Sequence, residues 1–400
     1  NLMTNNKRVQ RGWHFLQIPG PSNTPERVLR AMSQPTMDHR GPEFGLITTD
    51  ILAKTKQLFQ TSGEVIIYPS SGTGAWEAAL TNLFNPGDKI LAFETGYFAV
   101  LWKNLAENIG LEVEWIKSDW RQGVDPNKIE TALKNDVEKT IKGVMVIHNE
   151  TCNGITSDLH SIRQAIDNAK HPALFLADVV SSLGTTAFNQ DELGVDVAIC
   201  ASQKGLMMPP GLGFNSINER AFNYSKNSEF AQSYWKWDRI VEMNKTGYYP
   251  YTPASGLFFG LHEALDMIIE EGLENVVARH ELMGKACRIA ADRWGLENQC
   301  LNSDEYSDST TALIIPNGHN ADELRKTIYN QLNMSLGTGL GQLKSKVFRI
   351  GHLGDMNELM IMGTLSGVEM GMSMNQVPFN KGGAQAALEF LAQNIKVKIS

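Results

Sequence analysis

Short apolar runs alternate with segments of helical periodicity through the first half of the chain. The apolar runs lie at 65–68, 89–94, 112–117, 143–149, 173–180 and 195–201, and helical spacing recurs between them at 75–80, 98–108, 126–134 and 159–169. Runs that are apolar throughout are typical of parallel strands buried on both faces. The pattern therefore predicts an α/β fold, with a large domain in which helices sandwich a mostly parallel sheet.

The last third of the chain predicts a smaller α+β domain. A long helix is expected over 274–294, strands over 310–315 and 346–350, and helices over 321–332 and 357–372. A chain of 400 residues exceeds the usual size of a single core, which also favours two domains. We expect an N-terminal arm over 1–18, a large domain over 19–270 and a small C-terminal domain over 271–400.

Composition narrows the class of protein. The net charge of -8 argues against a general nucleic-acid or acidic-membrane binder. No apolar run approaches the roughly 20 residues of a membrane span, and the start of the sequence lacks the pattern of a secretory signal. The four cysteines have no paired spacing, so we expect reduced thiols rather than disulfides or a metal site, and a cytoplasmic location.

The candidate chemistry centres on two charged residues at the ends of apolar runs. Lys204 follows the run at 195–201, and Asp178 interrupts the run at 173–180. A lysine at the exit of a buried strand can be paired, shifted in pKa or used covalently as a Schiff base with an aldehyde; the alternative is that it only extends to water. A lysine and an aspartate together are what pyridoxal phosphate needs, the one for its aldehyde and the other for its pyridine nitrogen.

Other polar residues also follow predicted strands. Ser71 and the Ser/Gly/Thr-rich turn around it stand between a strand and a helix, where backbone N–H groups can bind a phosphate; Thr151 follows the run at 143–149. In open parallel sheets the binding site lies beyond the carboxyl ends of the strands. We therefore expect Ser71, Thr151, Asp178 and Lys204 to meet at one edge.

Each of three basic residues allows two interpretations. His39 and Arg40 lie in a loop, where they are either solvated, which base rates favour, or face an anionic substrate. Arg349 lies inside an apolar strand, so its guanidinium needs a carboxylate. That carboxylate is either an internal partner or the α-carboxylate of an amino acid.

Taken together, these motifs resemble the class V aminotransferases of fold type I, in particular the serine-, aspartate- and alanine-glyoxylate branch. The resemblance covers about residues 17–375. It rests on Pro-Gly-Pro-Ser-Asn at 19–23, Ser-Gly-Thr-Gly at 71–74, His-Asn-Glu-Thr at 148–151, Asp-Val-Val-Ser-Ser at 178–182, Ser-Gln-Lys at 202–204, Tyr-Pro-Tyr-Thr at 249–252 and Arg-Ile-Gly at 349–351.

The resemblance implies a role for each matched residue. It implies that Lys204 carries pyridoxal 5'-phosphate and that Asp178 pairs with the ring nitrogen, with Val180 and Phe98 on the two ring faces. It also implies phosphate binding by Ser71, Gly72, Thr73 and Gln203, and a hydrogen bond from Thr151 to the ring or the substrate. Arg349 would bind the substrate carboxylate. Tyr249 and Thr252, at the phosphate, and His39 and Arg40, at the substrate, would come from the second subunit of a homodimer.

The activity that the resemblance implies is transfer of an amino group from a small amino acid, serine or alanine, to glyoxylate. Aspartate or 3-hydroxyaspartate is the alternative donor, because Arg40 could bind a second carboxylate. A lyase or desulfurase on the same fold is a further alternative; a desulfurase needs a mobile reactive cysteine, for which Cys300 is the nearest candidate. A cofactor-free α/β binding protein is the non-enzymatic alternative.

Four positions depart from the family pattern. Phe98 stands where some relatives have tryptophan, and His39 stands where plant relatives have tyrosine. Cys152 and Asn153 replace the residues common at those positions, and a thiol is a poorer hydrogen-bonding group than a hydroxyl. These departures leave the choice of donor open.

Overall fold

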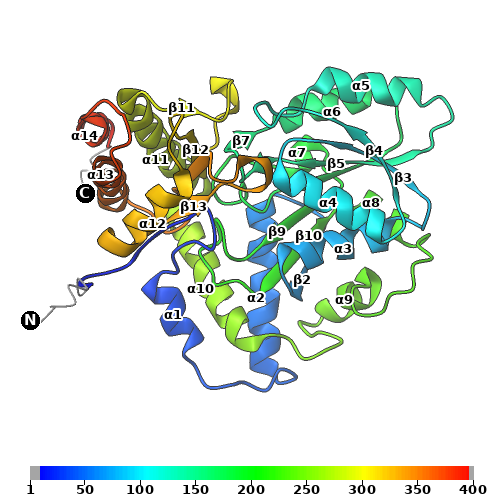
Figure 1. Ribbon diagram of the computed structural model, residues 1–400. Helices are drawn as coiled ribbons and strands as arrows, with labels where there is room; N and C mark the ends of the chain where they lie inside the picture. The colour runs from blue at the N-terminus through cyan, green and yellow to red at the C-terminus, as the bar shows by residue number, and fades with distance from the viewer. Residues whose placement is uncertain (1–9, 396–400) are drawn as a thin grey trace, which may run out of the picture.

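The large domain is built on a mostly parallel sheet, as the sequence predicts. The computed structural model describes residues 10–395, and in that range the sheet has seven strands in the order β2-β10-β9-β8-β5-β3-β4 (Figure 1). Only β10 runs antiparallel to its neighbours, β2 and β9. The strands are β2 (Glu64–Pro69), β3 (Lys89–Phe93), β4 (Glu112–Ile116), β5 (Ile141–Ile147), β8 (Leu174–Asp178), β9 (Val197–Ala201) and β10 (Leu212–Ile217).

Helices cover both faces of this sheet, and several begin at a polar cap that the sequence supplies. Asp125 caps α5 and Asp158 caps α6, each by accepting bonds from backbone N–H groups of the first turn. The helices of this part are α1 (Glu26–Met32), α2 (Pro42–Phe59), α3 (Gly72–Leu83), α4 (Tyr97–Asn108), α5 (Pro126–Asn135), α6 (Leu159–Asn168), α7 (Gln190–Leu193), α8 (Glu219–Ser225), α9 (Trp237–Asn244) and α10 (Ser255–Glu271). A short hairpin, β6 (Asn149–Glu150) with β7 (Ile155–Thr156), follows β5.

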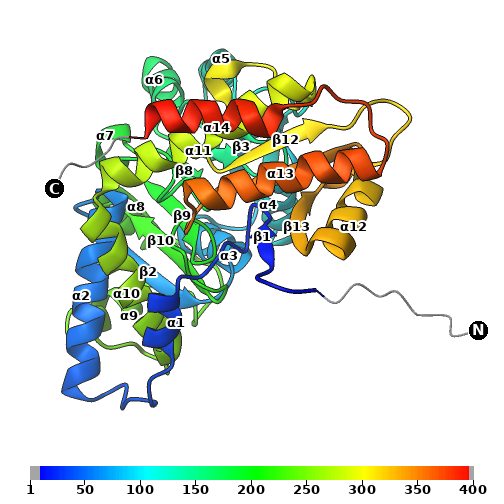
Figure 2. The same ribbon diagram turned by 90° about the vertical axis from the view of Figure 1, so that its left-hand side faces the viewer.

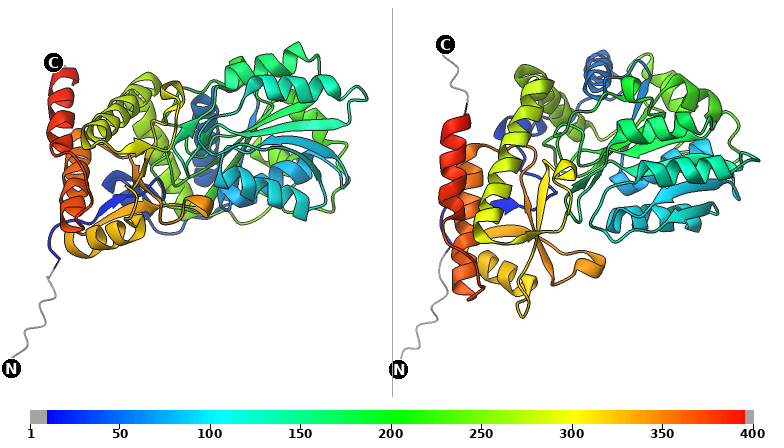
Figure 3. Two further views of the ribbon diagram at one scale, coloured as in Figure 1. Left: turned by 45° about the horizontal axis from the view of Figure 1, so that its top comes forward. Right: turned by 90° about the horizontal axis from the view of Figure 1, so that it is seen from above.

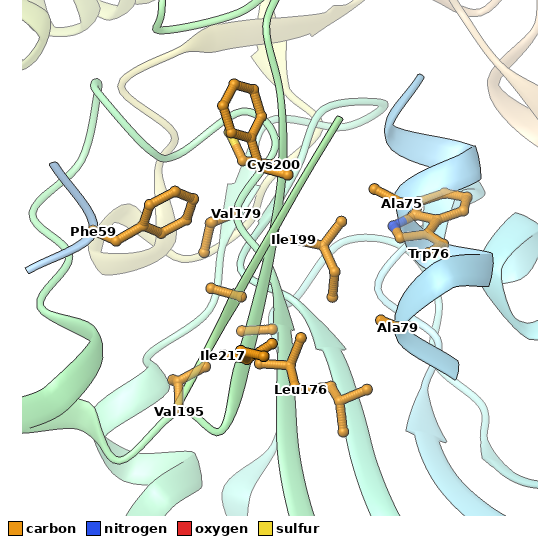
Figure 4. Close-up of a cluster of buried hydrophobic side chains, with 14 of the residues drawn as sticks. Phe59, Ala75, Trp76, Ala79, Leu176, Val179, Val195, Ile199, Cys200 and Ile217 are labelled. Atoms are coloured by element: carbon orange, nitrogen blue, oxygen red, sulfur yellow. The ribbon is translucent and has the colours of Figure 1, made fainter. Parts of the chain in front are cut away.

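The core lies between the central strands and the helices packed on them. Figure 4 shows Leu176 and Ile199 on the side of the sheet that faces α3, from which Ala75 and Ala79 point toward them. All four side chains are fully buried. Burial of apolar surface on both faces is what holds β8 and β9 in place, and the two strands end at Asp178 and just before Lys204.

The small domain is an antiparallel sheet with one parallel edge strand, packed on long helices (Figure 2). Its order is β1-β13-β14-β12-β11. The elements are β1 (Phe15–Gln17), α11 (Leu273–Trp294), β11 (Glu297–Asn298), the 3-10 turn η1 (Ser303–Glu305), β12 (Thr310–Ile314), α12 (Ala321–Leu332), β13 (Met334–Thr338), the 3-10 turn η2 (Gly341–Leu343), β14 (Val347–Gly351), α13 (Glu358–Met374) and α14 (Gly383–Asn394). Figure 3 shows these helices on the side of the molecule away from the large sheet.

The predicted N-terminal arm is partly a strand of the small domain. Phe15 to Gln17 pair in parallel with Met334 to Leu336, so β1 forms an edge of that sheet; residues 1–9 of the predicted arm lie outside the described residues. The boundary expected near residue 270 stays a prediction. One buried apolar cluster ends at Val276 and the next begins at Met283, and α11 runs through both without a break.

The segment after β1 crosses from the small domain to the large sheet. A Cβ placed on Gly351 would lie 2.3 Å from the carbonyl oxygen of Ile18, so β14 and this segment approach each other more closely than any side chain allows. Ser22 then binds the large domain through two bonds, from its N–H to the Gln203 carbonyl (2.9 Å) and from its hydroxyl to the Lys204 carbonyl (2.8 Å). The segment 18–22 therefore connects the small-domain sheet to Lys204.

Two of the expectations drawn from composition concern the cysteines and membrane-spanning segments. All four cysteines are buried and none is in a disulfide bond. Among residues 10–395, no helix combines the length and the apolar character that crossing a bilayer requires.

The central strands should carry a large share of the stability. We expect Leu176→Ala, which removes a fully buried side chain from β8, to lower the free energy of unfolding by about 2–5 kcal/mol, because the truncation leaves a cavity. Urea unfolding followed by circular dichroism measures this. Leu359→Ala is the matched control, since Leu359 is 81% exposed and should change the midpoint little. Equal shifts in the two variants would contradict the assignment of the core.

Candidate active site

A cavity of about 250 Å³ opens beyond the carboxyl ends of the central strands. It lies where the sequence places its candidate chemistry. Nine residues expected at a cofactor line it: Ser71, Gly72, Thr73, Phe98, Thr151, Asp178, Val180, Gln203 and Lys204. Five more residues complete the lining: Gly20, Pro21, Trp76, Ile147 and Asn149.

Lys204 is a buried amine at the floor of this cavity. It follows β9, and its Nζ donates a hydrogen bond to the carbonyl of Pro19. Burial lowers the pKa of Lys204 to about 7; the positive charge of Arg349 acts in the same direction, and the negative charge of Asp178 acts against it. A lysine with its pKa near neutrality is in good part a neutral amine, which is the nucleophilic form.

Asp178 is the carboxylate that faces the same cavity. It ends β8, and its Oδ1 accepts a bond from the Val180 N–H (2.8 Å) while its Oδ2 accepts one from the indole N–H of Trp76 (2.7 Å). Burial raises the pKa of Asp178 to about 7, and these two bonds together with Lys204 act against that rise. The carboxylate is fixed in orientation by donors on both oxygens.

The N-terminus of α3 supplies an anion site. Ser71 is its N-cap and accepts a bond from the Gly74 N–H (3.3 Å), so the first turn presents backbone N–H groups and the positive end of the helix dipole to the cavity. Gln203 lines the same end, and its Oε1 is buried without a hydrogen-bond partner in the described structure. A bound group with hydrogen-bond donors and acceptors would satisfy this amide.

Thr151 and Asn149 belong to a buried hydroxyl network. Thr151 donates through Oγ1 to Ser181 Oγ (2.9 Å), and the Asn149 amide donates to Ser181 Oγ (2.7 Å) and to Ser309 Oγ (2.8 Å). The network holds the wall of the cavity opposite α3. It leaves the Thr151 side chain fixed rather than free to rotate.

Arg349 is a buried cation without an acidic partner. Its Nε donates to the carbonyl of Thr338 (2.8 Å) and its Nη1 to the carbonyl of Thr151 (2.9 Å), and no carboxylate within residues 10–395 forms an ion pair with it. Burial lowers the pKa of Arg349 to about 10. Of the two interpretations left open by the sequence, the internal ion pair is therefore absent from the described structure.

The residues of the cavity fit pyridoxal phosphate. A neutral amine for the aldehyde, a fixed carboxylate for the ring nitrogen and a helix N-terminus for the phosphate all face one space. Phe98 and Val180 offer apolar surface on its lining, as an aromatic ring requires. A ring and a phosphate can thus be accommodated without a buried charge left uncompensated.

Five predicted residues do not line this cavity: Arg349, His39, Arg40, Tyr249 and Thr252. Arg40 and Thr252 are exposed, whereas Tyr249 is buried. The Tyr249 hydroxyl and the His39 Nε2 are buried atoms without a hydrogen-bond partner in the described structure. Within one chain, therefore, none of the five lines the cavity, although Arg349 binds the backbone carbonyl of Thr151, which does line it.

Trp76 is the most informative residue that sequence reasoning missed. Its position on a helix with regular apolar spacing is typical of a core residue, and no local signal marks its indole N–H as a partner of Asp178. Gly20 and Pro21 belong to the Pro-Gly-Pro-Ser-Asn motif, to which the sequence assigns no contact with the site. The restriction of that motif by two prolines was the available signal that its backbone approaches something closely.

A second polar cluster lies away from the cavity and has its own counter-charge. Asp50, His262 and Asp266 come close enough together to hold a metal ion. The ammonium of Lys54 already binds both aspartates, and His262 Nε2 lies 2.6 Å from Asp50 Oδ2. The cluster is a salt-bridged contact between α2 and α10.

Comparisons with known proteins find relatives over nearly the whole chain. The family model described as aminotransferase class-V matches residues 14–340. A serine–glyoxylate aminotransferase of Methylorubrum extorquens is 44% identical, with 96% of this chain and 97% of the relative covered. An L-aspartate–glyoxylate aminotransferase of Paracoccus denitrificans is 40% identical, with 93% and 94% covered.

Solved structures resemble the fold closely. The crystal structure of ureidoglycine–glyoxylate aminotransferase from Bacillus subtilis superposes with a TM-score of 0.88 at 26% identity, and covers 96% of this chain and 100% of that one. The similarity extends over both domains. It confirms the predicted class of fold.

The tight contact between Gly20 and Lys204 should control the reactivity of the amine. A Cβ on Gly20 would lie 2.2 Å from Lys204 Nζ, so Gly20→Ala displaces the amine from its position. We expect the rate of covalent attachment of pyridoxal phosphate to fall by about 100-fold, because reacting groups tolerate little misplacement. Gly318→Ala is the control, since it also lies at positive φ (+86°, against +136° for Gly20) but meets no atom within 4 Å. An attachment rate equal in the two variants would refute the expectation.

The lowered pKa of Lys204 should appear in the pH dependence of stability. In the cofactor-free protein the folded amine loses its proton near pH 7, whereas the unfolded amine keeps it to about 10.5. The unfolded state binds the extra proton in this window, so the free energy of unfolding should rise with pH there, at most by about 1.4 kcal/mol per unit. Lys204→Met lacks the titrating group and should lack this rise. Urea unfolding of both proteins at pH 7 and pH 9 measures the difference; parallel changes would contradict it.

Proposed function

The chain belongs to the class-V aminotransferase family and is an aminotransferase, and from that premise we propose that it transfers an amino group from serine or alanine to glyoxylate, with pyridoxal phosphate as its cofactor. One observation carries the proposal. The amine of Lys204, the carboxylate of Asp178 and the N-terminus of α3 face a single cavity.

Pyridoxal phosphate, when bound, supplies an aldehyde that joins the donor amine and a ring that takes up the electrons left when the α-proton departs. Asp178 holds the ring nitrogen protonated by offering it a fixed negative charge. Its two oxygens are already oriented by the N–H groups of Val180 and Trp76. The first turn of α3, with Ser71, Gly72 and Thr73, binds the phosphate together with Gln203.

Lys204 has two roles in this proposal. Its amine would hold the cofactor through the cofactor's aldehyde. When free, the same amine would be the base that takes the α-proton of the donor and the acid that gives that proton back. Its pKa near 7 suits both directions, since neither protonation state is strongly disfavoured at neutral pH.

Arg349 and Thr151 orient the donor. Arg349 offers a buried guanidinium that forms no ion pair in the described structure, and an α-carboxylate would pair with it in a bidentate contact. Thr151 is fixed beside it by its bond to Ser181.

A second copy of the chain completes the site. Ser71 and Thr73 are exposed in the isolated chain although they belong to the phosphate end of the cavity. We assign the covering groups to Tyr249, Thr252, His39 and Arg40 of a partner subunit, whose own cavity they do not line. The buried, unpartnered atoms of Tyr249 and His39 are consistent with donors and acceptors that act across an interface.

The chemistry of the cysteines argues against a desulfurase. That reaction requires an exposed, mobile thiol that can reach the substrate, and Cys300 is 1% exposed. Burial raises the pKa of Cys300 to about 12, so the thiolate is strongly disfavoured. The non-enzymatic alternative, a binding protein, does not explain why a buried amine and a buried carboxylate face one cavity.

Half-reactions with single donors test the proposal. The purified protein loaded with pyridoxal phosphate is mixed with serine, alanine or aspartate without acceptor, and conversion of the cofactor to its amine form is followed by visible absorbance; glyoxylate is then added and glycine is measured. We expect conversion by serine or alanine to exceed conversion by aspartate. Lys204→Ala should bind the cofactor without supporting conversion.

The outcomes separate the alternatives. Conversion by aspartate alone would assign the protein to the aspartate donors. A protein that binds no pyridoxal phosphate, or that releases pyruvate from serine without forming the amine form, would refute the proposed transfer.

A further inference from the structure

Asp178 is held by one donor from the backbone and one from a side chain. The backbone donor is the N–H of Val180, which any residue at that position would supply. The side-chain donor is the indole N–H of Trp76, 2.7 Å from Oδ2. Among the described residues, the hydrogen bond from Trp76 is therefore the one bond to this carboxylate that a substitution can remove.

The indole is held firmly in place. Trp76 lies on α3, five positions after the N-cap Ser71, and its ring stacks on Trp102 of α4 with centroids 5.6 Å apart and planes 12° from parallel. Trp76 is 4% exposed and Trp102 is 1% exposed. The helix that presents its N-terminus to the phosphate thus also presents a fixed donor to the carboxylate.

The carboxylate needs this donor because its surroundings favour the protonated form. Asp178 is buried, the acidic side chain of Glu150 adds repulsion, and the thiol of Cys200 of β9 is neutral. Lys204 is the cation on the favourable side. An indole N–H donates and never accepts, so it stabilises the ionised carboxylate specifically.

We propose that Trp76 is a positioning residue that keeps Asp178 ionised and aimed at the ring nitrogen of the cofactor. The proposal rests on the proposed function, since it assumes that pyridoxal phosphate occupies the cavity. It adds that Trp76, a residue of the apolar core, partly determines how tightly the protein binds the cofactor and how that affinity depends on pH.

The chain offers a matched control for the loss of an indole N–H. Trp102 has the same side chain, is also almost fully buried and forms the other half of the same stack, but its Nε1 has no hydrogen-bond partner in the described structure and it does not line the cavity. Trp76→Phe and Trp102→Phe therefore remove the same atoms from the same ring pair. Only the first removes a bond to Asp178.

The experiment titrates each cofactor-free protein with pyridoxal phosphate and follows binding by visible absorbance from pH 5 to 9. We expect Trp76→Phe to weaken binding at neutral pH by about 10- to 100-fold, the worth of a hydrogen bond to a charged group. We also expect its affinity to fall at a higher pH than in the wild type, because Asp178 takes up a proton more readily without the donor. Trp102→Phe should match the wild type in both measurements.

Equal affinities and equal pH profiles of the two variants would overturn the proposal. In an Asp178→Asn background, Trp76→Phe should add no further loss, since it acts through the carboxylate; an additive loss would show a merely structural role. A wild-type protein that fails to bind pyridoxal phosphate would instead refute the proposed function.

A measurement on the wild type keeps the test open should Trp76→Phe not fold. With tryptophan labelled with nitrogen-15, the indole resonance of Trp76 should shift with pH as Asp178 titrates and should shift again when the cofactor binds. The Trp102 indole serves as the internal reference. A Trp76 resonance that responds no more than that of Trp102 would overturn the proposal.

Discussion

The burial of two opposite charges at one edge of a sheet is the constraint on which the site depends. Asp178 and Lys204 end neighbouring strands, β8 and β9, whose apolar side chains have to be covered on both faces. That cover removes water from the strand ends, so each charged group is held away from its ordinary protonation state. The donors of Val180 and Trp76 offset part of the cost, and a cofactor with a pyridinium and an aldehyde would offset more.

Much of this arrangement could be predicted, because short continuous stretches of the sequence determine it. The apolar runs that end at Asp178 and just before Lys204 mark strand ends, and parallel strands bring their carboxyl ends to one edge. The Ser71 turn between an apolar run and a helix likewise identifies an anion site. The structure places all of these at one cavity.

Features that depend on distant partners could not be predicted in this way. Strand β10 carries Gly213, Asn215 and Ser216, whose polar groups are satisfied only in the folded state, as by the bond from Asn215 to the Ala75 carbonyl (2.9 Å). The strand β1 has three residues, and its partner is β13, more than 300 positions away. The role of Trp76 escaped for the same reason, because periodicity identifies the buried face of a helix but not what its one polar atom meets. For Arg349, only the folded structure shows that its guanidinium binds backbone carbonyls and forms no ion pair with a carboxylate among residues 10–395.

The segment 18–22 connects the sheet of the small domain with the end of the large sheet at Lys204. It continues from β1, at the edge of the sheet that carries Arg349 on β14, and it ends against the backbone of Gln203 and Lys204. A displacement of β1 would therefore shift the backbone against which Lys204 is held. The positions of the Arg349 guanidinium and of the Lys204 amine are in this way linked through five consecutive residues, 18–22.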